Sequence, residues 1–152
     1  MAAALPTPDF ARPVEVPRAV GRETLHRIAA TAVERAALAE RFDLIALDRL
    51  EAEVRLSLLA GGLVRFEADM TADVVQACVV TLEPVAGRLE ETFSLLYGRG
   101  GDGGEIVLDG EAEIVEPFDG SRIDIGEAVA QQLSLVLDPA PRAPDAPTDG
   151  ET

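Results

Sequence analysis

The clearest hydrophobic pattern lies between residues 49 and 80, where apolar side chains recur at every second position. The alternation continues on both sides of the Gly61-Gly62 pair, with charged or polar residues between the apolar ones. Strands place successive side chains on opposite faces, and paired glycines support a turn, so the pattern predicts a long β-hairpin with one wet face. We expect its second strand to bend near Met70 to Asp73 and then to pair with "GRLEETFSLLYG" across the turn "EPVAG".

Helical spacing occurs on either side of this hairpin. The segment "RETLHRIAATAVERAALAERF" predicts an amphipathic helix over about residues 24–41, and "GEAVAQQLSLVL" predicts a second helix near the end. Three prolines bracket "VEV" at residues 14–16, which is typical of a short edge strand. The apolar positions of the second helix are Val129, Leu133, Val136 and Leu137.

These elements predict an α+β fold in which a strongly bent, barrel-like antiparallel sheet carries an N-terminal and a C-terminal helix. We expect one domain over residues 10–140, with a flexible glycine-rich loop at 98–104. Residues 1–9 are predicted to be a disordered N-terminus. Residues 141–152, rich in proline and acids, are predicted to be a disordered tail.

Composition is consistent with a globular protein. The chain has 152 residues, 47% of them hydrophobic, and no apolar run approaches the roughly 20 residues of a membrane-spanning helix. The first residues do not resemble a secretory signal, and the single cysteine excludes an internal disulfide. We therefore expect a cytoplasmic protein with no membrane partner.

The distribution of charge says more about possible binding partners than the length of the chain does. The formal net charge is −15, and the two halves differ: residues 1–76 carry 9 basic and 12 acidic groups, and residues 77–152 carry 4 and 16. One run in the second half has seven carboxylates and no basic residue, which fits either a solvated face or a docking surface for a basic protein. The run comprises Asp102, Glu105, Asp109, Glu111, Glu113, Glu116 and Asp119.

Catalytic and metal-binding patterns are missing from the sequence. Cys78 falls in an apolar run beside Val74 and Val80, where burial disfavours a thiolate, so we expect a packing role rather than a nucleophile. His26 is the only histidine and is interpreted as a helix-surface residue. No phosphate loop, nucleophile elbow, calcium loop or cluster of metal-ligand residues occurs, so we predict no cofactor, no metal and no small-molecule substrate.

The order of the parts resembles the YceD family of large-subunit ribosomal RNA accumulation proteins. The resemblance covers roughly residues 10–142, and its most specific pieces are Cys78 followed by "VVTLEPV" and the late block "IDIGEAV" through "LSLVLDPAP". Within that block, Asp124, Leu133, Leu135, Pro139 and Pro141 fall at the acidic, leucine and proline positions of the family. Many members carry a second cysteine three residues after the first. Here that residue is Thr81, which argues against a metal or redox role.

The resemblance implies a non-catalytic role in ribosome biogenesis, in the accumulation or assembly of the large-subunit RNA. Combined with the charge, it suggests that the acidic half binds a basic ribosomal or ribosome-assembly protein, alone or within a pre-ribosomal particle. The alternative is direct RNA contact through arginines of the N-terminal half. These are Arg22, Arg27, Arg35 and Arg41 on the predicted first helix, and Arg49, Arg55 and Arg65 on the polar face of the hairpin. An enzyme without a recognised motif is the third hypothesis.

Overall fold

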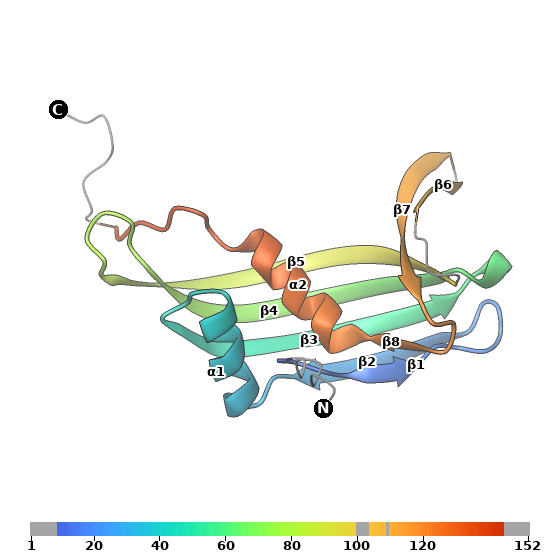
Figure 1. The fold of residues 1–152 in the computed structure, drawn as a ribbon, viewed down its shortest axis with the longest axis horizontal. Helices are drawn as coiled ribbons and strands as arrows, with labels where there is room; N and C mark the ends of the chain where they lie inside the picture. The colour runs from blue at the N-terminus through green and yellow to red at the C-terminus, as the bar shows by residue number, and fades with distance from the viewer. Residues whose placement is uncertain (1–8, 100–103, 109, 145–152) are drawn as a thin grey trace, which may run out of the picture.

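The computed structural model describes residues 9–99, 104–108 and 110–144, and it has an α+β fold (Figure 1). A six-stranded mixed sheet has the order β2-β3-β4-β5-β7-β6, and a second sheet pairs β1 with β8. The strands are β1 (Pro13–Glu15), β2 (Glu23–Ala29), β3 (Ala46–Leu58), β4 (Val64–Ala77), β5 (Pro84–Arg99), β6 (Gly104–Leu108), β7 (Glu111–Phe118) and β8 (Arg122–Asp124). The helices are α1 (Ala32–Arg41), α2 (Ile125–Val136) and the 3-10 turn η1 (Ala60–Gly62).

The predicted hairpin and the strand that follows it form the centre of the sheet. Strands β3 and β4 pair antiparallel from Leu58↔Val64 to Ala46↔Val75, and β4 pairs with β5 along its whole length. Gly61 and Gly62 have φ of 80° and 78°, a conformation that glycine adopts without steric cost. At Met70 to Asp73, where a bend was predicted, β4 continues as one uninterrupted strand with no shift of register. Between β3 and β4 the register shifts once, between Leu47 and Arg49 of β3.

The turn between β4 and β5 differs from the prediction. It spans residues 78–83, and the "EPVAG" segment, expected as the turn, starts with Glu83 and continues into β5. Pro84 is the first residue of β5, a position where proline is tolerated because no hydrogen bond to the neighbouring strand is required from its nitrogen. The glycine-rich loop predicted at 98–104 is also shorter, since Gly98 and Arg99 belong to β5 and Gly104 to β6, and residues 100–103 lie outside the described part.

The prediction of one helix over residues 24–41 is wrong for its first half. Residues 23–29 form β2 and pair with β3 from Glu23↔Ser57 to Ala29↔Glu51. The helix begins only after Thr31, whose hydroxyl accepts from the Glu34 amide while the Glu34 carboxylate accepts from the Thr31 amide. This capping box fixes the start of α1, and the ladder with β3 overrides the helical spacing before it.

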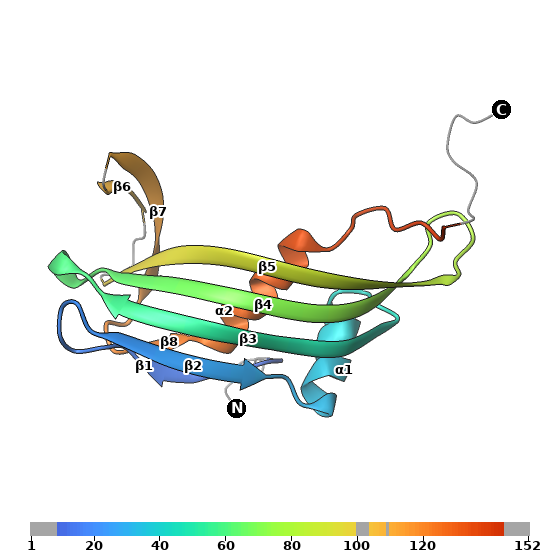
Figure 2. The same ribbon diagram turned by 180° about the vertical axis from the view of Figure 1, so that it is seen from behind.

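The hydrophobic core lies between one face of the sheet and the two helices (Figures 1 and 2). Alternate residues of β3 and β4 point into it, and α1 and α2 contribute Leu38, Val129 and Leu133, all fully buried. Burying each such side chain contributes about 1.5–3 kcal/mol, so these positions hold the helices on the sheet. The inward residues of the two central strands are Leu47, Leu50, Ala52, Val54, Leu56, Val64, Phe66, Ala68, Met70, Ala72 and Val74.

The sheet does not close into a barrel. Strands β2 and β6 stand at its two edges, and β7 joins β5 in parallel over only four pairs, from Leu96↔Val115 to Arg99↔Phe118. The antiparallel β6–β7 hairpin then rises away from the main layer in both views (Figures 1 and 2). An open mixed sheet with a projecting hairpin therefore replaces the expected barrel-like antiparallel one.

The end of the described chain remains packed. Pro141 and Ala143, which the prediction placed in the tail, are buried, and the amide of Val79 donates to the Pro141 carbonyl at 2.9 Å. Residues 1–8 and 145–152, which hold most of the two predicted disordered ends, lie outside the described residues. Neither α1 nor α2, the helices of the described ranges, has the length and apolarity to cross a membrane.

Candidate functional site

Cys78 directly follows β4, in the first position of the turn rather than in a strand. Its side chain is fully buried, as predicted, but Val80, predicted to share its face, is 41% exposed. The amides of Val80 and Thr81 both lie 3.4 Å from the Cys78 sulfur. The turn thus folds back over the thiol and holds it with peptide N–H donors.

These contacts change the chemistry of the thiol. The Thr81 side chain, the Ala143 and Thr81 amides and the Val80 amide together lower the pKa of Cys78 to about 7, although burial opposes this. The described residues contain no group of three His, Cys, Asp or Glu side chains able to hold a metal ion. His26, found in β2 rather than on a helix, has its Nε2 3.2 Å from the Thr24 hydroxyl. Within the described part, Cys78 therefore has neither a histidine base nor a set of metal-ligand partners. Its sulfur accepts hydrogen bonds from the turn that follows it and so stabilises that turn.

The late motif block, which begins with "IDIGEAV", contains α2 and packs against the N-terminal segment that carries Phe10 and Arg12. Asp124 is the N-cap of α2: one carboxylate oxygen accepts from the Glu127 amide at 3.0 Å and from the Arg12 amide at 2.8 Å. The amide of Ile125 donates to the Arg12 carbonyl at 3.1 Å. Gly126 is buried against the same segment, where a Cβ would lie 2.3 Å from the Phe10 carbonyl oxygen. These residues of "IDIGEAV" have a structural role.

The other positions of that block divide between core and surface. Leu133 is fully buried, whereas Leu135 is 77% exposed and Pro139 is exposed. Both Leu133 and Pro139 were expected as structural positions, and Leu133 is a core residue of α2. Leu135 has no packing role in the described part of the chain.

Five of the seven predicted acidic residues lie in the described part, along the β6–β7 hairpin and the turn after it. Asp102 and Asp109 fall outside it. Glu113 accepts from both terminal nitrogens of Arg65, at 2.6 and 2.9 Å, and Asp119 accepts from the amides of Ser121 and Arg122. These bonds lower the pKa of both carboxyls. The remaining three, Glu105, Glu111 and Glu116, are exposed.

The four arginines expected on the predicted helix do not share a surface, whereas Arg49, Arg55 and Arg65 of the hairpin lie on one face of the sheet. Arg22 precedes β2, Arg27 lies on the sheet face opposite the helices, and Arg35 and Arg41 belong to α1. Arg27 pairs with Glu53 at 3.0 Å, Arg35 donates to the Ala30 carbonyl at 2.8 Å, and Arg41 binds both oxygens of Glu127. Only the helical half of the predicted helix exists, so the common face that it implied does not form.

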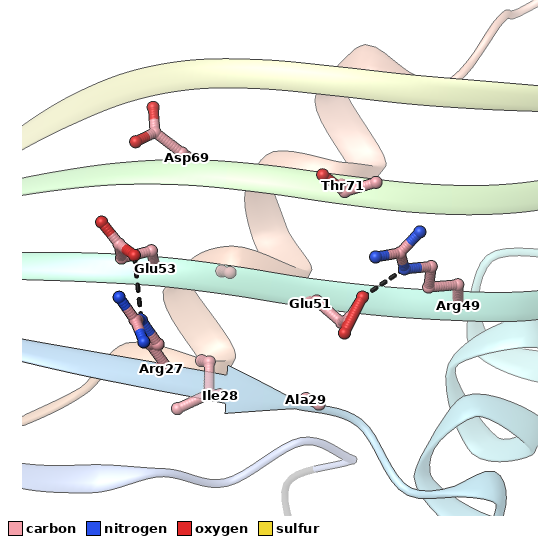
Figure 3. A pocket seen from close by; sticks show the side chains of 9 residues that line it. Arg27, Ile28, Ala29, Arg49, Glu51, Glu53, Asp69 and Thr71 are labelled. Carbon is pink, nitrogen blue, oxygen red and sulfur yellow. Dashed lines mark hydrogen bonds and ion pairs between the residues drawn. The ribbon is translucent and has the colours of Figure 1, made fainter.

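The helix-free face of the sheet has a shallow hollow of about 400 Å³ over β2, β3 and β4 (Figure 3). Its charged side chains pair with one another: Arg27 with Glu53, and Arg49 with Glu51. Asp69, also on this face, accepts from the Thr92 hydroxyl at 2.7 Å and from Arg55 at 3.2 Å, which lowers its pKa. A substrate would have to break these pairs, so the hollow is an ion-paired surface rather than a prepared pocket.

Two features were missed by sequence reasoning. Val107 and Ile114, on the β6–β7 hairpin, are 74% and 70% exposed, and Leu82, in the turn after Cys78, is 76% exposed with a φ of 64°. The alternation Glu105-Val107 and Ala112-Ile114-Glu116 in the printed sequence was the available signal for a strand pair with an uncovered apolar face.

Comparison with known proteins gives one family. The family model described as large ribosomal RNA subunit accumulation protein YceD matches residues 66–151, more than half of the chain. The matched part runs from β4 past α2 and includes both motif blocks, whereas β1, β2, α1 and β3 precede it. Among curated proteins, and likewise among solved structures, no match was found.

Proposed function

Because this chain belongs to the YceD family of large ribosomal RNA subunit accumulation proteins, as the resemblance predicted, we propose that it acts in ribosome biogenesis. The proposed role is non-catalytic and cytoplasmic: the protein supports accumulation of the large-subunit RNA by binding a basic ribosomal or ribosome-assembly protein. The acidic C-terminal half supplies the binding surface, and the partner is held alone or within a pre-ribosomal particle.

The difference between the arginines and the glutamates carries this proposal. Most arginines of the N-terminal half pair with carboxylates of the same chain, as in the bidentate pairs Arg12–Glu34 and Arg65–Glu113. Glu105, Glu111 and Glu116 are exposed, and no described residue forms an ion pair with them. Exposed charges without partners contribute most to the field that steers a protein of opposite charge.

Direct RNA binding is the weaker alternative. Phosphate binding requires cations that can replace counterions, and an arginine already paired with a carboxylate must first be released. The net charge of −15 adds long-range repulsion of the RNA backbone. The arginines that share the helix-free face are each paired with a carboxylate of the same chain, which favours a protein partner; they are Arg27, Arg49, Arg55 and Arg65.

The proposal of a non-catalytic role is supported by the site geometry. The buried Cys78 thiol is hydrogen-bonded by its own turn, and the hollow on the sheet is occupied by internal ion pairs. General acid–base or nucleophilic catalysis requires such a group to face a substrate. Cys78 is buried, and the carboxylates Glu51 and Glu53 are already held by arginines, which supports a non-catalytic role.

The experiment is capture of the tagged full chain from its own cells, with and without ribonuclease, at two ionic strengths. Salt from about 0.1 M to about 1 M shortens the electrostatic screening length from about 10 Å to about 3 Å. We expect a basic ribosomal or assembly protein to stay bound after ribonuclease treatment and to be released by the higher salt. Retention of ribosomal RNA alone, with every protein lost after ribonuclease, would contradict the proposal and favour the RNA alternative.

A further inference from the structure

The β6–β7 hairpin has an apolar face that no other described element covers. In the ladder, Val107 lies opposite Ala112 and Glu105 opposite Ile114, so these side chains share one face with Glu116. All five are exposed, Val107 and Ile114 by 74% and 70%. We call these five residues the hairpin patch.

The position of the hairpin explains why the patch is uncovered. Through the β5–β7 pairing, Glu116 lies beside Tyr97 on the helix side of the sheet, whereas Val115 lies beside the buried Leu96 on the other side. The patch therefore continues the side on which α1 and α2 cover the sheet. The hairpin, however, rises away from the layer formed by the sheet and the helices. Helix α2 crosses the sheet and does not extend over the hairpin (Figures 1 and 2).

The edge of the sheet at this hairpin has no neighbouring strand among the described residues. Within them, strand β6 pairs with β7 alone and is the last strand in the order of the sheet. An edge strand presents unpaired peptide N–H and C=O groups to which an extended segment can add. A strand added there would place alternate side chains beside Val107 on the same face.

The negative charge around this edge favours a basic segment as its binding partner. The described residues of β6 and β7 contain four glutamates and no basic residue, and only Glu113 has an ion-pair partner. A second copy of the hairpin would bring like charges together, which destabilises cross-strand pairing. An added segment of alternating apolar and basic residues would cover Val107 with its apolar side chains and place its basic side chains on the opposite face, which carries Glu111. Glu105 and Glu116 border the apolar side chains of the patch and add to the attraction of a basic segment.

We propose that β6 binds an extended basic segment of a partner protein by strand addition, with the segment's apolar side chains covering the hairpin patch. This inference rests on the proposed function and specifies the mode of binding: the partner contributes a strand in which arginine or lysine alternates with aliphatic residues.

The first test is a titration of the ¹⁵N-labelled full chain with a capped peptide of alternating arginine and valine. We expect amide shifts confined to β6 and β7, and slower hydrogen exchange at the β6 amides that face outward. The control peptide has the same sequence with alternate amide nitrogens methylated, which removes strand hydrogen bonding but keeps the charge. Equal binding of both peptides, or shifts confined to the helix-free face or the Cys78 turn, would overturn strand addition.

Variants separate local contacts from net charge. Glu105→Lys/Glu111→Lys should weaken peptide binding about fivefold or more at low salt, since each reversal replaces an attraction with a repulsion. Glu40→Lys/Glu83→Lys makes the same change in net charge at two exposed carboxylates away from the hairpin, and it should weaken binding less than twofold. Val107→Thr/Ile114→Thr keeps β-branched side chains and should also weaken binding, with the melting temperature checking the fold. Equal effects of the two charge variants would overturn the inference.

Capture from cells distinguishes this inference from the proposed function. If the Glu105→Lys/Glu111→Lys protein still captures the same basic proteins as the wild type, the hairpin is not the docking site and the proposed function stands. If the peptide adds to β6 but the wild-type protein captures no basic ribosomal or assembly protein, the strand-addition site stands and the proposed function fails. A concentration-dependent dimer through β6 would contradict the choice of a basic partner.

Discussion

Replacing Gly126 by alanine tests the close approach between α2 and the N-terminal segment. At an open helical position, alanine is favoured over glycine by about 1 kcal/mol, so propensity alone predicts stabilisation. Here the new Cβ would lie 2.3 Å from the Phe10 carbonyl oxygen and 3.1 Å from the Arg12 nitrogen, against ordinary contacts of 3.4–4 Å. The segment that carries Phe10 must therefore shift by roughly 1 Å.

That shift has a calculable cost. Overpacking a closed site costs about 1–3 kcal/mol. Moving the segment also weakens two hydrogen bonds, from the Arg12 amide to Asp124 and from the Ile125 amide to the Arg12 carbonyl, each worth about 1 kcal/mol. After the gain in propensity, we expect Gly126→Ala to lower the free energy of unfolding by about 2–4 kcal/mol. For a chain of this length, the melting temperature should fall by roughly 5–15 °C.

The assay is urea and thermal unfolding followed by circular dichroism, with Gly87→Ala as the matched control. Gly87 lies in β5, where a Cβ would meet only Val74 Cγ2 at 4.0 Å, so alanine there should be neutral or slightly stabilising. A Gly126→Ala protein that is as stable as the wild type, or more stable, would refute the packing argument, because helix propensity would then have outweighed the contact with Phe10.

The other predictions concern the core and two titrating groups. Leu133→Ala should lower the free energy of unfolding by about 2–5 kcal/mol, and Leu135→Ala, the same change at a 77% exposed position, by less than about 0.5 kcal/mol, in urea unfolding. The hydrogen bond from Arg12, with Thr31 adding to it, lowers the pKa of Glu34 from 4.5 to about 2. The stability that Glu34 contributes is thus complete above pH 4.5 and is lost as the pH falls toward 2; Glu34→Gln should remove this contribution and flatten the acid profile, and an unchanged profile would refute it. The pKa of Cys78, lowered from 9.0 to about 7, makes stability rise from pH 7 to 9; Cys78→Ala should abolish the rise, and its persistence would refute the assignment.

Periodicity in the sequence was enough to predict the centre of the fold. The two-residue alternation around Gly61-Gly62 gave the β3–β4 hairpin, and the C-terminal spacing gave α2 with Val129 and Leu133 inward. Periodicity gave the wrong element for residues 24–29, because their apolar positions fit a helix whereas the segment forms a strand that pairs with β3. The Thr31-x-x-Glu34 capping box was the local signal for the true helix start.

Long-range geometry limited the prediction of the candidate site. No local sequence signal indicates that β7 pairs with β5 in parallel or that the hairpin lies away from both helices. The exposure of Val107 and Ile114 could therefore be recognised only from the structure. The partners of Arg65 and Arg41 are 48 and 86 residues away in sequence, which no spacing rule identifies. Cys78 is buried as predicted, but it lies in the turn after β4 and not on the strand face from which its burial was inferred, and Val80 of that face is exposed.

The pairing of β1 with β8 affects the order in which the chain can fold during synthesis. Pro13 lies opposite Asp124, so the N-terminal strand has no partner in its sheet until more than a hundred further residues have been translated. The β3–β4–β5 meander involves contacts closer in sequence and can form earlier, since local contacts need less loop closure. The nascent chain therefore holds its first strand unpaired while the meander folds. Docking of α2 onto Phe10 and Arg12, which joins the two ends of the described domain, can occur only after residues 125–136 have been translated.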